Sequence, residues 1–259
     1  MTPKHIVVIG GGHNGLVCAA YLARAGHNVT VLEKNKEVGG AAFTDTTTFP
    51  GYKISLASYL NSLMLSEVVE DLELRRFGYE VLPRNPSSFT PLPDGRSLLL
   101  GPDMGFNQKE IAKFSKKDSL AYPKYEEALG AVAEWVAGLM KMTPPNIPPK
   151  TWRDWQNIGR FLWHVRKLVS RKVFTLLNLF LHNDNPLAYL DSWFESDVLK
   201  ATLLTDAMIG ATKLSAYVLL HHVMGEAGGA RGVWGYQRGG MGAISNAIAS
   251  SCVESGVRI

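Results

Sequence analysis

The sequence is poor in cysteine, and its two cysteines, Cys18 and Cys252, lie far apart in a chain of 259 residues. Neither belongs to a Cys-x-x-Cys pair or to a run with metal-ligand spacing, which argues against a dithiol redox centre and a structural zinc site. His221 and His222 are adjacent, but no cysteine or acidic cluster nearby supplies further ligands. We therefore expect packed or partly exposed histidines and no metal site.

Long apolar runs are also absent. No stretch reaches the roughly 18 apolar residues that a membrane-spanning helix needs, and the most apolar helical run, Val173 to Leu181, is interrupted by Thr175 and Asn178. Only a few polar residues precede the apolar run His5 to Ile9, so we expect no signal or transit peptide. We expect a cytoplasmic protein that does not span a membrane.

Charge of one sign is not in large excess. The 27 basic and 23 acidic residues give a net charge of +4, and 46% of the residues are hydrophobic, as in a soluble globular protein. This mild basicity is a weak basis for an anionic partner, and we expect no nucleic acid. No Ser-His-Asp arrangement or pair of carboxylates stands out, so the sequence assigns no catalytic residue.

What the sequence does contain begins with a strand–helix–strand pattern. The continuous apolar run His5 to Ile9 ends in glycines, as buried parallel strands do. Asn14 to Ala25 has the pattern of a helix, Gly26 ends it, and Val29 to Leu32 is the second predicted strand. Together they predict a βαβ unit in about thirty residues.

The glycine-rich turn between the first strand and the helix fits the pattern G-x-G-x-x-G. Its residues are Gly10, Gly11, Gly12, His13, Asn14 and Gly15. In this motif the first glycine permits a tight turn, the second lets the backbone approach a pyrophosphate, and the third allows close helix–strand contact. The helix that follows offers free N–H groups and a positive dipole end to phosphates. The context on both sides makes this a strong prediction of dinucleotide binding.

Glu33 closes the second strand, eighteen residues after Gly15. Its carboxylate can accept hydrogen bonds from a ribose hydroxyl, and it would repel a 2′-phosphate, which argues against NADP. Lys34 follows, and then a second glycine pair, Gly39-Gly40, leads into Ala41-Ala42. In an NAD dehydrogenase the chain would continue into the next helix, whereas a loop here can lie along a longer cofactor. These residues favour FAD.

Taken together, the glycine motif, Glu33 and Gly39-Gly40 resemble the FAD-binding N-terminus of the flavoprotein superfamily that includes glutathione reductase, amine oxidases and carotenoid desaturases. Further segments resemble its phytoene-desaturase-like branch, over nearly the whole chain: Gly12 to Leu16, Gly39 to Ala42, Ala57 to Leu60, Arg84 to Pro91, Gly232 to Tyr236 and Gly239 to Gly242. The resemblance implies FAD held by Gly10, Gly11, Gly12, His13, Asn14, Gly15, Glu33, Lys34, Gly39, Gly40, Ala41 and Ala42.

The resemblance also implies an α/β fold, in which a Rossmann-like FAD-binding domain of the glutathione-reductase and amine-oxidase type carries an inserted, largely helical substrate domain. We place the βαβ unit and glycine loop in residues 1–78, the substrate or lid domain in 79–225, and the return to the FAD domain in 226–259. Members of the branch are roughly twice as long. We therefore expect this chain to be the N-terminal part of a longer protein.

Local patterns predict the remaining elements. Ser66 to Phe77 reads as a helix, residues 79–100 as short antiparallel strands with a hairpin turn at Asp94-Gly95, and Ser119 to Met224 as mostly helical. Gly225 to Gly242 reads as a glycine-rich loop that either approaches the flavin or is an ordinary crossing between domains. Ala243 to Ser255 reads as a helix, and Gly256 to Ile259 as the start of a strand.

The segment 152–177 reads as an amphipathic helix. Arg153, Arg160, His164, Lys167 and Arg171 share one stripe, and an apolar stripe that includes Trp155, Ile158, Leu162 and Val165 lies opposite. One interpretation is a domain helix with a core face and a solvated basic face. The other is a helix that lies on a membrane surface and admits a lipophilic substrate.

The leading functional prediction is an FAD-dependent dehydrogenase or desaturase that removes hydride from an apolar substrate, polyene or lipid-like. In such enzymes the flavin performs the chemistry, so a dedicated acid–base residue is not required. One nucleotide motif alone favours oxygen or a quinone as electron acceptor. Two alternatives stay open: an amine-oxidase-like flavoprotein, and a non-catalytic protein that works through interactions. The sequence says nothing about the oligomeric state.

Overall fold

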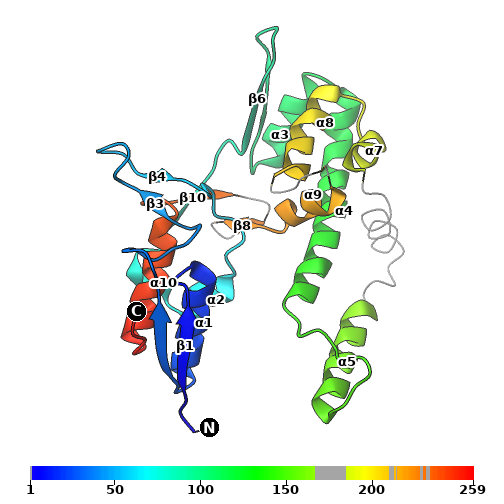
Figure 1. Cartoon of the computed structure of the whole chain (residues 1–259). Coiled ribbons are helices and arrows are strands. Elements are labelled where there is room, and N and C mark those ends of the chain that lie inside the picture. The colour runs from blue at the N-terminus through cyan, green and yellow to red at the C-terminus, as the bar shows by residue number, and fades with distance from the viewer. Residues whose placement is uncertain (1, 167–184, 210–212, 214, 228–229, 232–233) are drawn as a thin grey trace. The chain divides into compact units, whose positions relative to one another are not determined.

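The computed structural model describes residues 2–166, 185–209, 213, 215–227, 230–231 and 234–259. The chain divides into two compact units, drawn in Figure 1. Unit 1 consists of Met1–Arg84 and Glu226–Ile259, and unit 2 is Asn85–Gly225. The first boundary therefore follows Arg84, where the sequence placed it after residue 78.

Unit 1 is built on a parallel sheet of β1 (His5–Ile9) and β2 (Asn28–Leu32), connected by α1 (His13–Arg24). The register pairs Val7 with Thr30. Arg258 extends the sheet beyond β2, because its N–H donates to Val29 O and its carbonyl accepts from Val31 N, at 3.0 and 2.7 Å. The two strands and the helix predicted by the sequence are present, and the strand expected at 256–259 is a single parallel bridge.

One face of this sheet is covered and the other is open. Ile6, Val8, Val29 and Val31 pack on the side of α1 and α10 (Gly242–Glu254), where they join a core centred on Leu16, Ala19, Ala20, Ala247, Ile248 and Cys252. On the other face Val7, Ile9 and Leu32 have exposed fractions of 49%, 89% and 56%. Figure 1 looks onto this open face, with α1 behind the strands.

Short strand pairs complete unit 1: β3 (Thr44–Asp45) with β4 (Ile54–Ser55), β5 (Val81–Pro83) with β10 (Gly235–Gln237), and β8 (Glu226–Ala227) with β9 (Ala230–Arg231). The prediction of a loop over 225–242 was therefore wrong at these strands, whereas residues 238–241, between β10 and α10, form a loop as predicted. Strands of two or three residues are stabilised by their partners, and β10 pairs with β5, about 150 residues earlier in the chain.

The helix predicted over 66–77 is divided. It consists of α2 (Ser66–Asp71) and a 3₁₀ turn, η1 (Leu74–Phe77), with Glu73 between them at a φ of 49°. A non-glycine residue in this left-handed conformation ends the regular helix. Val69, Leu72 and Leu74 on either side of this break are buried in the unit 1 core, so packing selects two short turns in place of one helix.

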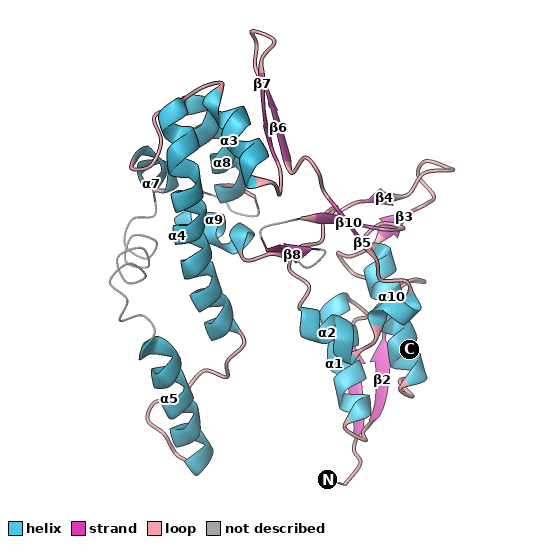
Figure 2. Cartoon of the chain, turned by 180° about the vertical axis from the view of Figure 1, so that it is seen from behind, coloured by secondary structure: helices cyan, strands magenta, loops and turns pink. Residues whose placement is uncertain are grey.

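Within the part of the chain that the structure describes, unit 2 begins with a hairpin and its other regular elements are helices, as Figure 2 shows. Its elements are β6 (Ser88–Pro91), β7 (Ser97–Leu100), α3 (Met104–Ala112), α4 (Lys116–Met140), α5 (Trp152–Val165), α7 (Pro186–Asp191), α8 (Asp197–Leu204), η3 (Thr205–Ala207) and α9 (Ala216–Val223). The predicted hairpin is present. Helix α3 was missed; its N-cap Asp103 accepts a hydrogen bond from Phe106 N at 2.6 Å.

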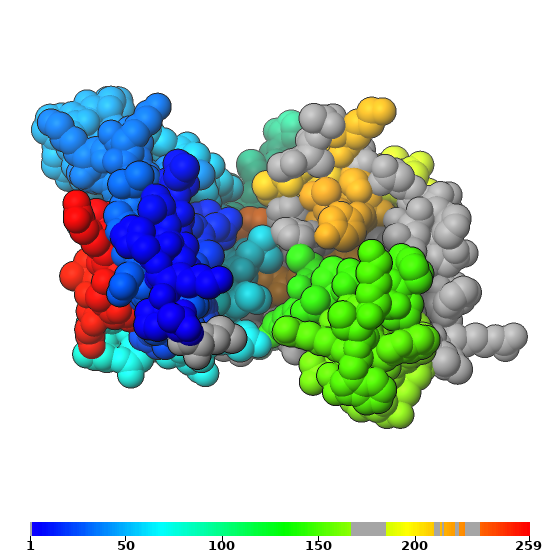
Figure 3. Space-filling view, turned by 60° about the horizontal axis from the view of Figure 1, so that its bottom comes forward, coloured from blue at the N-terminus to red at the C-terminus, as the bar shows by residue number. Residues whose placement is uncertain are grey.

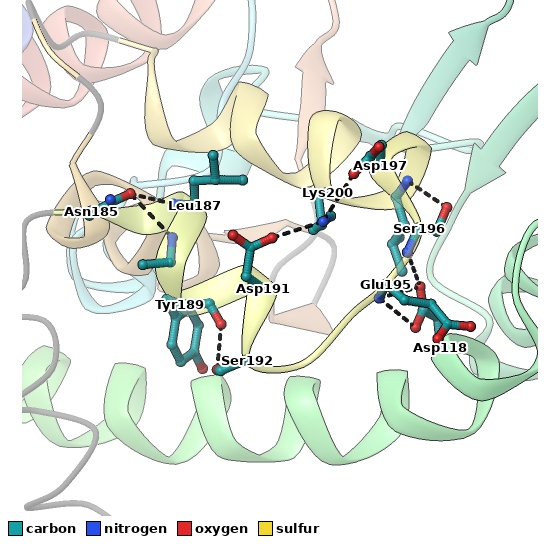
Figure 4. A network of polar contacts seen from close by, with 12 residues as sticks. Asp118, Asn185, Leu187, Tyr189, Asp191, Ser192, Glu195, Ser196, Asp197 and Lys200 are labelled. Carbon is teal, nitrogen blue, oxygen red and sulfur yellow. Dashed lines mark hydrogen bonds and ion pairs between the residues drawn. The ribbon is translucent and has the colours of Figure 1, made fainter.

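The core of unit 2 is aromatic and is closed by a buried carboxylate. Tyr125 and Phe194 pack with ring centroids 5.0 Å apart, between α4 and the segment joining α7 to α8. Asp118, in the first turn of α4, is fully buried and accepts hydrogen bonds from Glu195 N and Ser196 N at 3.0 and 2.8 Å (Figure 4). This carboxylate joins the start of α4 to the start of α8.

Candidate dinucleotide site

The first glycine loop forms the turn that its sequence predicts. Gly10 has a φ of +98°, and its N–H donates to Leu32 O at 2.7 Å, which holds the end of β1 against β2. A Cβ on Gly15 would lie 2.5 Å from Gly10 O, so only glycine lets α1 pack this closely on the turn. Gly10 and Gly15 therefore shape the loop from within.

The N-terminus of α1 is open toward the space in front of Gly12. Gly12 is the N-cap residue and provides no side-chain hydrogen bond, and the first turn, which starts with His13, carries no acidic residue. A Cβ on Gly12 would meet no heavy atom nearer than Gly39 O at 4.0 Å. The first-turn amides and the positive end of the helix dipole thus face room that a phosphate can fill.

Glu33 lies beside this loop in the half-buried position that follows β2. Its carboxylate accepts hydrogen bonds from Asn35 N at 2.9 Å and Gly11 N at 2.7 Å. These backbone N–H groups, Asn35 first, lower the pKa of Glu33, so the side chain is ionised at neutral pH. A carboxylate has about four lone-pair sites, and acceptor capacity remains for a ribose hydroxyl.

The second glycine loop lies directly against the first. Gly39 pairs with Gly12 in a parallel bridge, and its N–H donates to Gly11 O at 2.8 Å. Gly39 has a φ of +134°, and a Cβ there would lie 2.5 Å from Ala42 O, so the turn requires glycine. Two loops that are separated in sequence by the whole of α1 and β2 thereby form one continuous backbone surface.

The loop Gly239–Gly242 before α10 lies against the strands that follow the second glycine loop. Gly242 N donates to Thr44 Oγ1 at 2.8 Å, and Met241 N donates to Ser55 Oγ at 3.0 Å. Ser245 Oγ donates to Ala42 O at 2.9 Å. The N-terminus of α10 is thus capped by hydroxyls, whereas that of α1 is not. The sequence singled out none of these three hydroxyl residues, because isolated serines and threonines carry no pattern.

The predicted site residues lie close together in the structure but differ in how far their side chains are buried. The structure brings together the backbones of Gly10 to Gly15, Glu33 and Gly39 to Ala42. Within this group Asn14, Lys34 and Ala41 are exposed, His13 is half-buried and Ala42 is buried. Ala42 uses its carbonyl to hold Ser245 and is therefore a supporting residue of the loop.

Neither a metal site nor a membrane-spanning helix is found among residues 2–166, 185–209 and the described parts of 213–259. No three His, Cys, Asp or Glu side chains come together there, and no helix there is long and apolar enough to cross a membrane. His221 and His222 lie on α9, and their side chains fall outside the described structure. Residues 167–177 of the predicted amphipathic helix also lie outside the described residues.

The turn, the open helix end and the acidic residue after β2 define a Rossmann-like nucleotide-binding domain. Residues 8–69 match the family model described as NAD(P)-binding Rossmann-like domain. The chain is homologous to pyridine nucleotide-disulfide oxidoreductase domain-containing protein 2 of Rattus norvegicus, with 45% identity over 98% of this chain. That match covers 46% of the rat protein, so the chain spans about half the length of this relative. The match confirms the expected relationship, over nearly the whole chain, to longer proteins with an oxidoreductase domain.

Two further comparisons bear on the same region and on the fold. A limonene dehydrogenase of Castellaniella defragrans has a subunit that is 36% identical over 44% of this chain, and the match covers 21% of that protein. A solved structure of a putrescine oxidase mutant has a TM-score of 0.54 and 15% identity, and the likeness covers 99% of this chain and 50% of that one. The latter shows the fold alone, and with the family model it confirms the predicted α/β Rossmann-like class.

Proposed function

We propose that this chain is the dinucleotide-binding half of an FAD-dependent oxidoreductase that removes hydride from an apolar substrate. The observation that carries the proposal is the open backbone surface at the start of α1, formed by Gly12 and the first-turn amides, which we call the cradle. There, Gly12 leaves a space that a Cβ would enter without touching the protein, and the ionised Glu33 stands beside it. A binding loop for an anionic, ribose-containing group needs these two features together.

Each residue of the cradle has a distinct task in this proposal. The first-turn amides that begin at His13 bind the pyrophosphate, and Gly12 allows the backbone to approach it. Glu33 accepts hydrogen bonds from the ribose of the adenosine, and its negative charge disfavours a 2′-phosphate. The Gly39–Ala42 loop, which pairs with the first glycine loop, would contact the part of a longer cofactor beyond the pyrophosphate, and this is the reason for proposing FAD.

The bound flavin would supply the redox chemistry by accepting hydride from a substrate carbon. The homology to an oxidoreductase domain-containing protein supports a redox role. An apolar substrate is supported by the partial similarity to a limonene dehydrogenase, because limonene is a hydrocarbon. Orientation of the substrate and exclusion of water remain tasks for the protein.

Purification of the chain tests the proposal directly. We expect visible flavin absorbance bands, and release of FAD on denaturation, identified by chromatography. If the chain is colourless as purified, titration with FAD should restore the bands. Release of NAD(H), or binding of NAD(H) in preference to FAD, would contradict the assignment of the cofactor.

Anaerobic reduction separates the functional alternatives once FAD is bound. Bleaching of the flavin by limonene or by a polyene, but not by putrescine, is the result expected for an enzyme acting on apolar substrates. Bleaching by amines alone would favour the amine-oxidase-like alternative. A flavin that dithionite reduces but that no substrate of either class reduces would favour a non-catalytic role. The longer rat relative, treated in parallel, controls for the contribution of the part that this chain does not cover.

A further inference from the structure

Helix α5 carries a row of large apolar side chains on its exposed side. Trp152, Trp155, Leu162 and Trp163 have exposed fractions of 76%, 59%, 59% and 52%. At about 100° per residue these four positions fall within an arc of about 100° on the helix. The prediction of a buried apolar stripe was thus wrong for Trp155 and Leu162, while Ile158 and Val165 are half-buried as that interpretation expected.

The orientation of α5 is fixed by contacts at both ends of the helix. At its start, Thr151 and Asp154 form a reciprocal capping box, and the Asp154 carboxylate also accepts from Asn146 Nδ2 at 2.7 Å. Near its end, His164 stacks on Trp135 of α4 and donates from Nε2 to the Trp135 carbonyl at 3.0 Å. His164 lies roughly opposite the middle of the exposed row, so docking on α4 turns the row outward.

The positive charge of the molecule is concentrated on this same segment. Residues 141–166 contain five basic residues and one acidic residue, an excess of +4 that equals the net charge of the whole chain. The five basic residues are Lys141, Lys150, Arg153, Arg160 and Arg166. The one acidic residue, Asp154, is held in the capping box and is buried. The segment therefore presents basic groups with no exposed carboxylate among them.

One basic group lies within the apolar row and two others lie further round the helix. Arg166 is within the arc of the row, with its guanidinium 4.5 Å from the centre of the Trp163 ring. The exposed Arg160 and Arg153 lie about 60° and 80° beyond the edge of the arc. Beside the row, Arg160 and Trp163 help to line a depression of about 340 Å³. Figure 3 looks onto this end of unit 2, where the green atoms of α4 and α5 form the surface.

From this arrangement we propose that α5 docks unit 2 on an anionic lipid surface. The tryptophans and Leu162 enter the boundary between headgroups and acyl chains, where amphipathic aromatic rings are stabilised. Arg166 meets lipid phosphates beside Trp163, and the long side chain of Arg160, the nearer of the two arginines outside the row, extends to the same interface. The excess of positive charge favours an anionic lipid surface over a neutral apolar partner. The inference does not depend on the proposed redox function.

Co-sedimentation of the full chain with vesicles tests this proposal. At low salt we expect binding to vesicles of phosphatidylcholine mixed with phosphatidylglycerol, with a blue shift of tryptophan fluorescence, and weak binding to phosphatidylcholine alone. Each arginine near the surface contributes about fivefold, so Arg160→Gln with Arg166→Gln should weaken binding roughly thirtyfold. Binding should also fall as salt is raised.

A matched pair of triple variants separates insertion from simple adsorption. Trp152→Ser, Trp155→Ser and Trp163→Ser together should abolish sedimentation, whereas Phe49→Ser, Tyr52→Ser and Phe89→Ser remove three aromatic rings of similar exposure elsewhere and should not. Circular dichroism confirms that both variants fold. Unchanged binding of the tryptophan variant would overturn the proposal, as would a wild-type chain that stays in the supernatant. Loss of self-association in the tryptophan variant, without any vesicle binding, would assign the row to a second copy.

Discussion

At the scale of single residues, Gly12 and Gly15 belong to the same motif but meet different surroundings. A side chain on Gly15 collides with the backbone of the protein itself, 2.5 Å away at Gly10 O. A side chain on Gly12 meets no protein atom closer than 4.0 Å. The fold therefore requires glycine at position 15. It does not require glycine at position 12, where a bound ligand can be the reason for this residue.

This difference allows ligand binding to be separated from folding. We expect Gly12→Ala to lower the stability of the chain by no more than about 1 kcal/mol, the usual cost of alanine at an N-cap. Overlap of one methyl group with a bound phosphate costs about 1–3 kcal/mol, so FAD binding should weaken roughly ten- to hundredfold. Fluorescence titration with FAD and thermal unfolding measure the two effects. Gly130→Ala, at an open helical position, is the control, and it should leave FAD binding unchanged.

The two cysteines should differ sharply in reactivity. Cys252 is fully buried in the unit 1 core, where its Sγ contacts Leu16 O at 3.1 Å, and burial raises its pKa to about 11. Since the thiolate is the reactive form, Cys252 should stay unmodified by iodoacetamide at pH 8, while the exposed Cys18 reacts. Mass spectrometry should show one label on the native chain and two after denaturation. Two labels under native conditions would contradict the packing of α10 on α1.

At the scale of secondary structure, sequence patterns predicted the elements whose contacts are local. The glycine motif, α1 and the two strands lie within about thirty residues, and each position is constrained by neighbours close in sequence. The hydroxyl groups that cap α10 could not be predicted from the sequence. Gly242 donates to Thr44, and Met241 donates to Ser55, across nearly two hundred residues. Strands β8 to β10 were missed for the same reason: glycine-rich composition indicates a loop unless the partner strand is known.

The link between α4 and α8 gives a prediction at this scale. Removal of the Asp118 carboxylate leaves the buried amides of Glu195 and Ser196 without their acceptor. We expect Asp118→Ala to destabilise unit 2 by about 2–6 kcal/mol, at roughly 1–3 kcal/mol for each of the two unsatisfied amides. Urea unfolding measures the loss of stability. Hydrogen exchange of the amides at the start of α8 measures the same loss at the site of the change.

A neighbouring carboxylate provides the control for Asp118. Asp191 forms an ion pair with Lys200 at 2.8 Å and has an exposed carboxylate, so Asp191→Ala should cost less than about 1 kcal/mol. Equal losses for the two variants would show that the buried hydrogen bonds of Asp118 are not what joins the two helices.

At the scale of the whole molecule, the exposed face of the β1–β2 sheet is the feature in which this chain differs from most α/β domains. Parallel sheets are usually covered on both faces, and β1 is apolar on both. Among the strands that the structure describes, β1 has β2 as its one neighbour. An unpaired edge next to exposed Val7 and Ile9 favours association with other chains.

A single charge on this face should therefore reduce self-association. Val7→Lys places an ammonium group on the open face, since Val7 is half-exposed there, and we expect the onset of light scattering to move to higher protein concentration. Val253→Lys makes the same change at an exposed position on α10 and serves as the control. If both variants behave alike, the effect comes from net charge and not from the sheet.

The division of unit 1 into two chain segments also determines an order of events during synthesis. Met1–Arg84 leaves the ribosome first, but α10, which covers Leu16 and Ala19 of α1, lies beyond the whole of Asn85–Gly225. At about 5–20 residues per second, translation of the intervening unit takes on the order of ten seconds. Throughout that interval α1 can pack on the β1–β2 sheet but lacks the part of its packing surface that α10 provides. The helical unit, although it is inserted in the middle of the chain, is thus the first that can complete its fold.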